Sequence, residues 1–218
     1  YTMNEVVKWG IIGLGNVAHE FANSFYNTKN AKLIAIASKS QSKLSKFKAN
    51  FNIDISNCHN EYEKLLNNNE VDIVYIALPN SLHYEWALKS LNSKKHILVE
   101  KPAFINFKET KNIFNHPHFN DLFIGEGFMF RYHPQIIKTI ELLRNNEIGL
   151  ITSMESSFGK NLLTKKSFFG FFNSSKFNKK KRIFSESLAG GAIFDHGSYI
   201  VSMSLLIASL IDGVDIEN

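Results

Sequence analysis

The sequence contains a single cysteine, Cys58, among its 218 residues. One cysteine cannot form an intrachain disulfide or a cysteine-based metal site, so domains that depend on either are excluded. The low cysteine content fits a reducing compartment. The opening residues, Tyr1 to Lys8, also lack the basic segment followed by an apolar segment that marks a secretory signal. We therefore expect a cytoplasmic protein.

Long hydrophobic runs are also missing. The longest uncharged apolar stretch, Gly197 to Ile211, is too short to cross a bilayer, and Asp195 and His196 directly precede it. This pattern predicts a buried helix and no association with a membrane.

The charged residues do not form a large block of one sign. Lysine and arginine exceed aspartate and glutamate by 25 to 20, and both signs are intermixed apart from the run Lys179 to Arg182. Phe177 and Phe184 flank that run, and cations beside aromatic side chains can serve a nucleic acid. A single short run is more typical of a solvated loop, so we expect no nucleic-acid partner. The pair His116 and His118 lacks supporting carboxylates or cysteines, so we also expect no metal site.

Strand-length apolar runs alternate with helix-length amphipathic segments over the first half of the chain. The expected strands are 6–12, 32–38, 71–78 and 97–100, and the expected helices are 16–27, 41–51 and 82–91. Regular alternation of this kind predicts an α/β fold with a doubly wound parallel sheet covered on both faces, a Rossmann domain. We place this domain at residues 1–124.

The pattern changes in residues 125–218, which we interpret as part of a second domain. We expect a helix at about His133 to Asn145, a strand at about Leu150 to Phe158 and a helix beginning near Gly191. The intervening segment, Lys160 to Ser187, has no clear periodicity and is either a functional flap or poorly ordered.

A glycine-rich turn follows the first expected strand and opens the first expected helix. It reads Gly13, Leu14, Gly15, Asn16, Val17 and Ala18. Gly13 permits a tight turn, Gly15 lets the backbone approach a pyrophosphate, and Ala18 allows close packing of helix on strand. The helix N-terminus then supplies an anion site, which predicts that these six residues bind a dinucleotide. The alternative is a glycine turn that binds nothing.

The second expected strand ends at Ser38, Lys39 and Ser40. Sites specific for NAD place a carboxylate here, on the ribose hydroxyls. A hydroxyl followed by a cation suits a 2′-phosphate instead, so we predict that Ser38 and Lys39 bind NADP, with NAD as a possible cofactor. The alternative is an ordinary solvated loop between strand and helix.

Three further stretches, Val71 to His83, Lys94 to Pro102 and Gly190 to Tyr199, carry a family resemblance. With the glycine turn, they make the chain resemble the glucose-fructose oxidoreductase and inositol dehydrogenase (Gfo/Idh/MocA) family over essentially its whole length. Tyr199 and the Ser-Lys-Ser turn are most similar to its glucose-fructose oxidoreductase, xylose dehydrogenase and dihydrodiol dehydrogenase members. The resemblance implies a second domain of α+β type with an open, mostly antiparallel sheet. It also implies that family members continue past Asn218, so we expect a chain truncated at its C-terminus.

Several site residues follow from this resemblance and from their place after parallel strands, where ligands of such sheets bind. Cofactor contacts are expected from Leu78, Pro79, Asn80, His83, Glu100 and Lys101. The peptide between Lys101 and Pro102 is a candidate for the cis form. Catalysis is assigned to Lys101 as proton donor or electrostatic clamp, to Tyr199 as acid and base, and to Asp195, which orients the substrate. Arg131 joins Lys101, Asp195 and Tyr199 as a substrate contact.

Each of these residues also has a structural alternative. A lysine after a strand is usually solvated, and a tyrosine on an apolar helix face usually belongs to the core. Arg131, together with His133, could serve interdomain structure, and His83 at a helix start could face solvent. His196 lies one residue off the shared face of Asp195 and Tyr199, so we place it behind them or at the surface.

The sequence thus predicts an NADP-dependent oxidoreductase that moves hydride between nicotinamide and a sugar or small polyol, as a homo-oligomer in its full-length form. The alternatives are an oxidoreductase that retains its cofactor and serves two substrates, and a dinucleotide-sensing regulator without catalysis.

Overall fold

The chain divides into two compact units, residues 1–127 and 128–218. The computed structural model describes residues 6–159, 164–166, 172–174 and 182–211. The sequence placed the boundary between residues 124 and 125.

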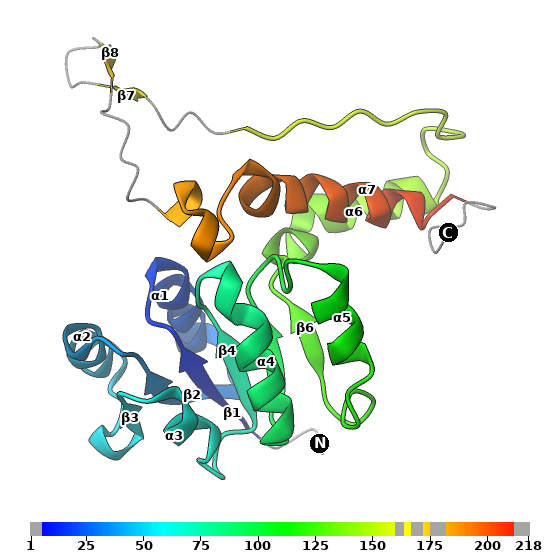
Figure 1. Ribbon diagram of the computed structural model, residues 1–218. Helices are drawn as coiled ribbons and strands as arrows, with labels where there is room; N and C mark the ends of the chain where they lie inside the picture. Colours follow the sequence, from blue (N-terminus) through cyan, green and yellow to red (C-terminus); the bar gives the residue numbers. More distant parts are fainter. Residues whose placement is uncertain (1–5, 160–163, 167–171, 175–181, 212–218) are drawn as a thin grey trace. The chain divides into compact units, whose positions relative to one another are not determined.

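The first unit is built on a six-stranded parallel sheet (Figure 1). Its strands are β1 (Val7–Ile12), β2 (Ala31–Ala37), β3 (Cys58–His59), β4 (Ile73–Ile76), β5 (His96–Val99) and β6 (Ile124–Glu126). They lie in the order β3-β2-β1-β4-β5-β6, and every neighbouring pair is parallel. This is the strand order of a Rossmann fold, so the predicted fold class is confirmed for the first unit.

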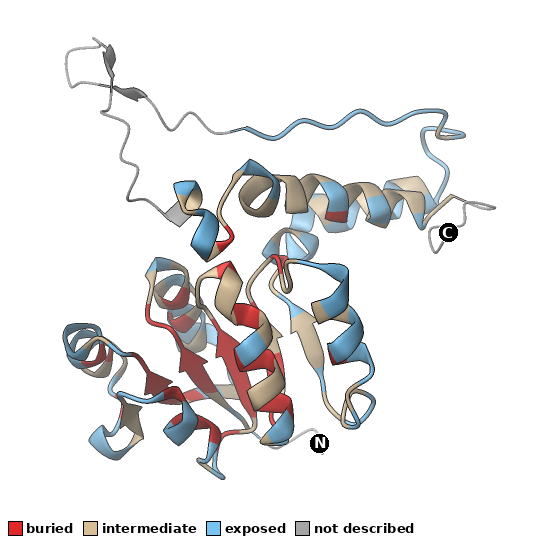
Figure 2. Cartoon of the chain, viewed as in Figure 1, coloured by how far each residue is buried: buried red, intermediate tan, exposed pale blue. Residues whose placement is uncertain are grey.

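Helices cover both faces of this sheet. They are α1 (Asn16–Asn23), α2 (Gln41–Phe51), α3 (Tyr62–Leu66), α4 (His83–Asn92) and α5 (Phe107–Phe114). Successive strand residues point to opposite faces, so Ile12 packs with α3, α4 and α5 while Ile11 packs with α1 and α2. The most buried residues of the first unit therefore lie in the strands and on the inner helix faces (Figure 2).

The predicted elements of the first unit are observed with small shifts at their ends. The predicted helix 16–27 is α1 followed by a 3₁₀ turn, Ser24–Asn27. The sequence did not predict β3, α3, α5 or β6. Strand β3 has only two residues, too few to show a periodicity.

The second unit contains α6 (Pro134–Arg144), a π-helical turn (Ile193–Gly197) and α7 (Ser198–Ala208), close to the expected helices. Strands β7 (Thr164–Lys166) and β8 (Phe172–Ser174) form an antiparallel pair. The predicted strand 150–158 is wrong, since residues 151–159 have no regular structure. A strand needs a paired neighbour, and in the described part of this unit only β7 and β8 are paired. The larger antiparallel sheet expected for the second domain is therefore not observed there.

The apolar segment at the end of the chain is less buried than predicted. Within α7, Ser202 is the buried residue, while Val201 and Leu205 are exposed. The helical stretch Glu186–Ala208 has the length and the apolar composition of a helix that crosses a membrane. A single stretch of this kind is weak evidence for a membrane span. The predicted burial of this helix is thus wrong, because the described residues of its unit supply no sheet to cover it.

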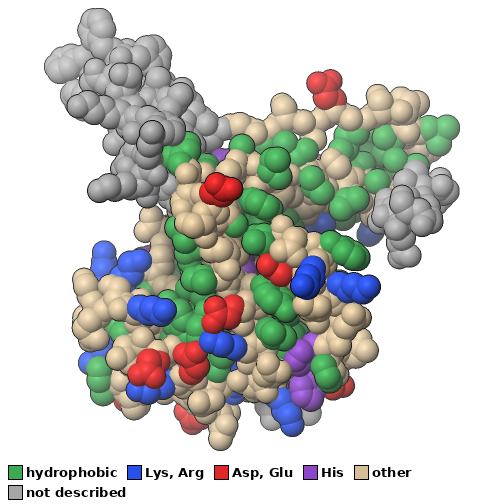
Figure 3. Space-filling model, in the orientation of Figure 1, with side chains coloured by type: hydrophobic (Ala, Val, Ile, Leu, Met, Phe, Trp, Pro, Cys, Tyr) green, Lys and Arg blue, Asp and Glu red, His purple; other side chains and the backbone are tan. Residues whose placement is uncertain are grey.

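Charges are mixed on the surface of the first unit. On the face drawn in Figure 3, lysine and arginine side chains alternate with aspartate and glutamate over its elements. The basic residues Lys179 to Lys181, with Phe177, lie outside the described residues.

Candidate functional site

The turn after β1 requires glycine at one position and leaves space at another. Gly13 has a φ of +90°, and a Cβ there would lie 2.5 Å from the carbonyl oxygen of Ala77. Gly15 precedes α1 with ordinary backbone angles, and a Cβ there would meet nothing within 4 Å. The packing of the protein thus requires glycine at position 13, whereas the open space at Gly15 is what the predicted approach of a pyrophosphate needs.

The N-terminus of α1 opens toward this space. No side chain caps it and no acidic residue occupies its first turn, so its first N–H groups and the positive end of its dipole can receive an anion. Leu14 and Ala18 are buried against the sheet, while Asn16 is exposed and Val17 half-buried. The predicted residues therefore divide into buried packing positions and positions that are at least partly exposed.

A surface pocket of about 340 Å³ adjoins this helix end. Leu14, Gly15, Asn16, His19, Glu20, Lys43, Lys46 and Phe47 line it. Lys43 and Lys46 come from α2 and lie three residues apart, which places both on one helix face. Sequence reasoning missed these two cations. Their i,i+3 spacing just after the Ser-Lys-Ser turn was the available signal.

The Ser-Lys-Ser turn is partly occupied by its own hydrogen bonds. The buried Ser38 hydroxyl accepts a hydrogen bond from the Ser40 backbone N–H at 3.2 Å, and the Ser40 hydroxyl caps α2 by accepting from the Lys43 N–H at 3.4 Å. Lys39 is exposed, with its ammonium 5.8 Å from the centre of the Tyr62 ring. Burial raises the pKa of the Tyr62 hydroxyl. Ser38 is thus buried and bonded within the turn, which does not fit the solvated loop of the alternative, whereas Lys39 is exposed.

His83 lies between the loops that follow β4 and β5. Its side chain is fully buried; Nδ1 lies 2.8 Å from the carbonyl oxygen of Pro102 and Nε2 lies 2.8 Å from that of Leu78. The solvent-facing alternative for His83 is therefore wrong, and a ring with no exposed surface does not support direct contact with a cofactor. Asn80, in the same turn, is also buried, whereas Leu78 and Pro79 are half-buried.

The loop after β5 carries Glu100, Lys101 and Pro102. The Lys101–Pro102 peptide is cis, as predicted. The Tyr75 hydroxyl donates a hydrogen bond to Oε1 of Glu100. Lys101 and Glu100 are both half-buried at the carboxyl edge of the sheet. Tyr75, a core residue of β4, was not predicted to take part in the site, because its partner lies in the loop after the neighbouring strand, β5.

The remaining predicted residues belong to the second unit. The Tyr199 ring centre lies 5.7 to 5.9 Å from those of Phe128, Phe130 and Phe158. Oδ2 of Asp195 lies 3.3 Å from Nδ1 of His196, within the π-helical turn. Such turns are frequent at functional sites. His196 thus contacts Asp195 and is half-buried, and its predicted place behind Asp195 or at the surface stays a prediction.

Arg131 is tied to helix α7. Its Nε and Nη2 donate to the Ser202 hydroxyl at 3.1 and 2.9 Å, and Nη2 lies 3.3 Å from the Ser202 carbonyl oxygen. These bonds give Arg131 a structural role within the second unit, while an interdomain role and a substrate contact both stay predictions. Lys101 belongs to the first unit, and Arg131, Asp195 and Tyr199 belong to the second.

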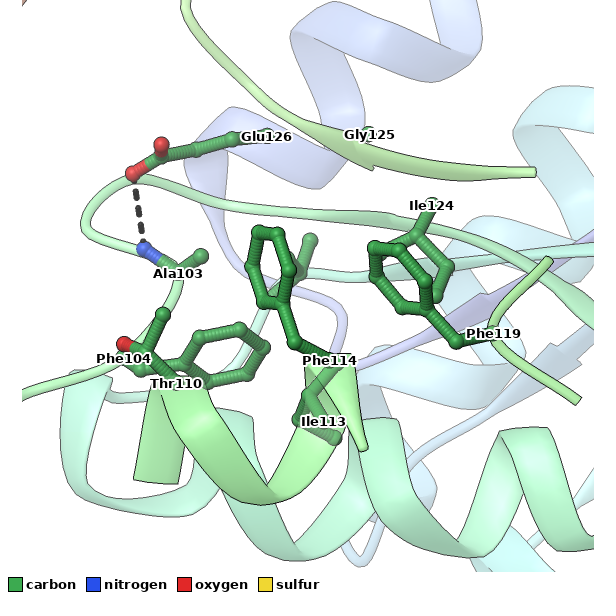
Figure 4. A pocket seen from close by; sticks show the side chains of 10 residues that line it. Ala103, Phe104, Thr110, Ile113, Phe114, Phe119, Ile124, Gly125 and Glu126 are labelled. Carbon is green, nitrogen blue, oxygen red and sulfur yellow. Dashed lines mark hydrogen bonds between the residues drawn. The ribbon is translucent and has the colours of Figure 1, made fainter. Parts of the chain in front are cut away.

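A second pocket, of about 390 Å³, lies against α5 and β6 (Figure 4). Its lining is mostly apolar and includes Phe104, Phe114, Phe119 and Ile124. At its rim, the Ala103 N–H donates to Oε1 of Glu126 at 2.8 Å. The sequence did not predict this pocket, since α5 and β6 were not predicted.

The described residues contain no group of three potential metal ligands. The rings of His116 and His118 are 5.7 Å apart, but Nε2 of His116 lies 3.0 Å from Oδ1 of Asn92, and its Nδ1 accepts from the His118 backbone N–H. The two ring nitrogens of His116 are therefore used within the protein.

Comparison with known proteins gives matches that agree with this geometry. Residues 7–128 match the family described as "Oxidoreductase family, NAD-binding Rossmann fold". Trans-1,2-dihydrobenzene-1,2-diol dehydrogenase of Danio rerio is 25% identical over 92% of this chain and 56% of its own length. D-xylose 1-dehydrogenase (NADP(+)) 2 of Haloferax volcanii is 29% identical over 95% of this chain and 59% of its own.

A solved structure supports the same relationship. A 3-ketoreductase from Actinomadura kijaniata in complex with NADP is 29% identical, with a TM-score of 0.60 over 66% of this chain and 46% of that one. The chain thus spans about half the length of the relatives that it matches.

Proposed function

Because the chain belongs to the Gfo/Idh/MocA oxidoreductase family, we propose that it forms the NADP-binding part of an enzyme that transfers hydride to or from a sugar or similar small polyol. The observation that carries this proposal is the glycine turn at the carboxyl edge of the sheet. Gly15 leaves open space beside an uncapped helix N-terminus, where a pyrophosphate would be bound by backbone N–H groups.

The charges near the end of β2 favour NADP over NAD. The turn after β2 holds Ser38 and Lys39 and no carboxylate, and Lys43 and Lys46 line the adjoining pocket. A 2′-phosphate would find cations here, whereas the ribose hydroxyls of NAD would lack their usual carboxylate partner. The relatives from Haloferax volcanii and Actinomadura kijaniata, whose names or structures include NADP, support the same choice.

The catalytic assignment follows the chemistry of a carbon-bound hydroxyl. The nicotinamide supplies or takes the hydride, and protein side chains must move the hydroxyl proton and hold the oxygen. We assign proton transfer to Tyr199, with Lys101 as an electrostatic clamp or proton donor and Asp195 as the group that orients the substrate. Relatives named for xylose and a dihydrodiol support a hydroxyl-bearing substrate.

Calorimetric titration of the chain with NADPH and with NADH tests the cofactor proposal. We expect tighter binding of NADPH. Lys43→Glu and, separately, Lys39→Glu should weaken NADPH about tenfold or more while changing NADH little, because each replaces a cation near the phosphate by an anion. Lys108→Glu makes the same charge change on the exposed surface of α5 and should leave both affinities unchanged. Equal affinities for the two cofactors would contradict the choice of NADP, and binding of neither would contradict the dinucleotide site.

A further inference from the structure

One peptide group at the proposed catalytic loop is bound at both of its polar atoms. The peptide joins Pro102 and Ala103, directly after the cis Lys101–Pro102 bond. Its carbonyl oxygen lies 2.8 Å from Nδ1 of His83 at the start of α4. Its N–H donates to Oε1 of Glu126 at the end of β6, also at 2.8 Å (Figure 4). Two side chains from separate elements therefore hold the backbone next to Lys101.

The second contact of His83 constrains its protonation. Nε2 lies 2.8 Å from the carbonyl oxygen of Leu78, and the ring is fully buried. Carbonyl oxygens only accept hydrogen bonds, whereas a neutral imidazole carries a single N–H. A neutral ring would therefore direct a nitrogen lone pair at one of the two oxygens. Both contacts are hydrogen bonds only if both ring nitrogens carry a proton.

We propose that His83 is a buried imidazolium that, with Glu126, clamps the Pro102–Ala103 peptide and thereby positions Lys101. The cation binds the carbonyl oxygen and the carboxylate binds the N–H of the same peptide group, so both charges polarise that group in the same direction. Hydrogen bonds to ionised groups are also shorter and stronger than neutral ones. The clamp therefore gives the buried ring a polarised carbonyl acceptor and holds the backbone of the loop in place.

The position of the clamp in the sheet decides which part of a dinucleotide it affects. His83 fixes the loops after β4 and β5, which lie on one side of β1, whereas β2 with Ser38 and Lys39 lies on the other side. This consequence rests on the proposed function: the clamp should shape the nicotinamide half of the site and leave the half that binds the adenosine phosphates unaffected.

The charge of His83 can be measured without any nucleotide. In the ¹⁵N-labelled chain at neutral pH, NMR should show both His83 ring nitrogens as protonated, and the assignment is made by their loss in His83→Gln. One protonated and one unprotonated nitrogen would overturn the imidazolium. Glu126→Gln should shift the His83 ring signals through the shared peptide, and unchanged signals would overturn the clamp.

The positioning role is tested by titrating two ligands, adenosine 2′,5′-bisphosphate and NADPH. His83→Gln should weaken NADPH about tenfold and leave the bisphosphate affinity within about twofold. Ser90→Ala is the control, because Ser90 is also fully buried in α4 but donates its hydroxyl to Trp86 within the same helix. Equal losses for both ligands, or no loss, would overturn the positioning role. A wild-type chain that binds neither ligand would instead contradict the proposed function, and the NMR spectra would still decide the clamp.

Discussion

The carbonyl oxygen of Ala77 occupies the space that a side chain on Gly13 would need, at 2.5 Å from the position of its Cβ. Gly15, two residues later, faces open space instead. The fold therefore requires glycine at position 13 and leaves position 15 unconstrained, and the proposed dinucleotide would supply the reason for glycine there.

This difference predicts opposite phenotypes for two matched variants. Gly13→Ala should lower the free energy of unfolding by roughly 2–5 kcal/mol, because it adds a clash to an unfavourable positive φ. Gly15→Ala should change stability by less than about 0.5 kcal/mol and still weaken dinucleotide binding strongly, since its methyl group would occupy the approach of the pyrophosphate. Urea unfolding and calorimetry measure the two effects. A Gly15→Ala chain that binds NADPH normally would place the phosphates elsewhere.

Lys95 provides a prediction on pH. Its buried ammonium donates to the carbonyl oxygens of Asn68 and Val71 at 2.8 and 2.7 Å, and burial lowers its pKa below the ordinary 10.5. Between the lowered pKa and 10.5 the unfolded chain binds a proton that the folded chain has released, so stability should rise with pH in that interval. The neutral amine still has two N–H groups for the two carbonyl oxygens.

Lys95→Met isolates this effect, because it removes the titrating group at similar side-chain length. The difference in unfolding free energy between the original chain and the variant should be constant at lower pH and should increase in favour of the original chain as pH approaches 10.5. A difference that stays flat or decreases there would show that burial does not favour the neutral amine.

The Arg131 contact with Ser202 should stabilise the second unit. Ser202→Ala is expected to lower its free energy of unfolding by about 1–2 kcal/mol, because a hydroxyl bound to the guanidinium is lost. Arg131→Lys should cost a similar amount, and the double variant should cost less than the sum of the two. Ser209→Ala, which removes a hydroxyl bonded within α7 to Leu206, is the control. Additive losses would mean that the contact contributes little.

Tyr199→Phe should separate packing from chemistry. Phenylalanine retains the ring contacts with Phe128, Phe130 and Phe158, so the packing of the ring should be preserved. Loss of the hydroxyl should reduce turnover of a polyol by about 10²- to 10⁴-fold if Tyr199 is the acid and base. Steady-state kinetics with NADP measures the loss. Unchanged turnover would remove Tyr199 from the chemistry and favour its role as a core residue.

The sequence predicted the elements whose signal is local. Strand β4 is a continuous apolar run because both of its faces are buried, and the last three residues of β1 are buried in the same way. The glycine turn after β1 was recognised by residue type alone. The cis Lys101–Pro102 peptide was predicted from a dipeptide and a family resemblance. The parallel fold and the proposed place of the cofactor site thus followed from short-range patterns.

Features that depend on distant partners were missed or predicted wrongly. The segment 150–158 has a strand-like composition, but a strand exists only where another strand pairs with it. Lys43 was overlooked because its proximity to Gly15 arises from the packing of α2 beside α1. The buried His83 ring contacts carbonyl groups in two different loops, and the residue pattern within α4 could not indicate these contacts.

The central place of β1 in the sheet also bears on biosynthesis. The Ile12 carbonyl accepts from the Ala77 N–H, and the Gly13 N–H donates to the Ala37 carbonyl. The glycine turn therefore lacks one of its two neighbouring strands until β4 has left the ribosome, because β4 follows it by about sixty residues in the sequence. A nascent chain that stalls before β4 would expose β1 as an unpaired apolar edge, so chaperones should bind this interval of translation in preference to later ones.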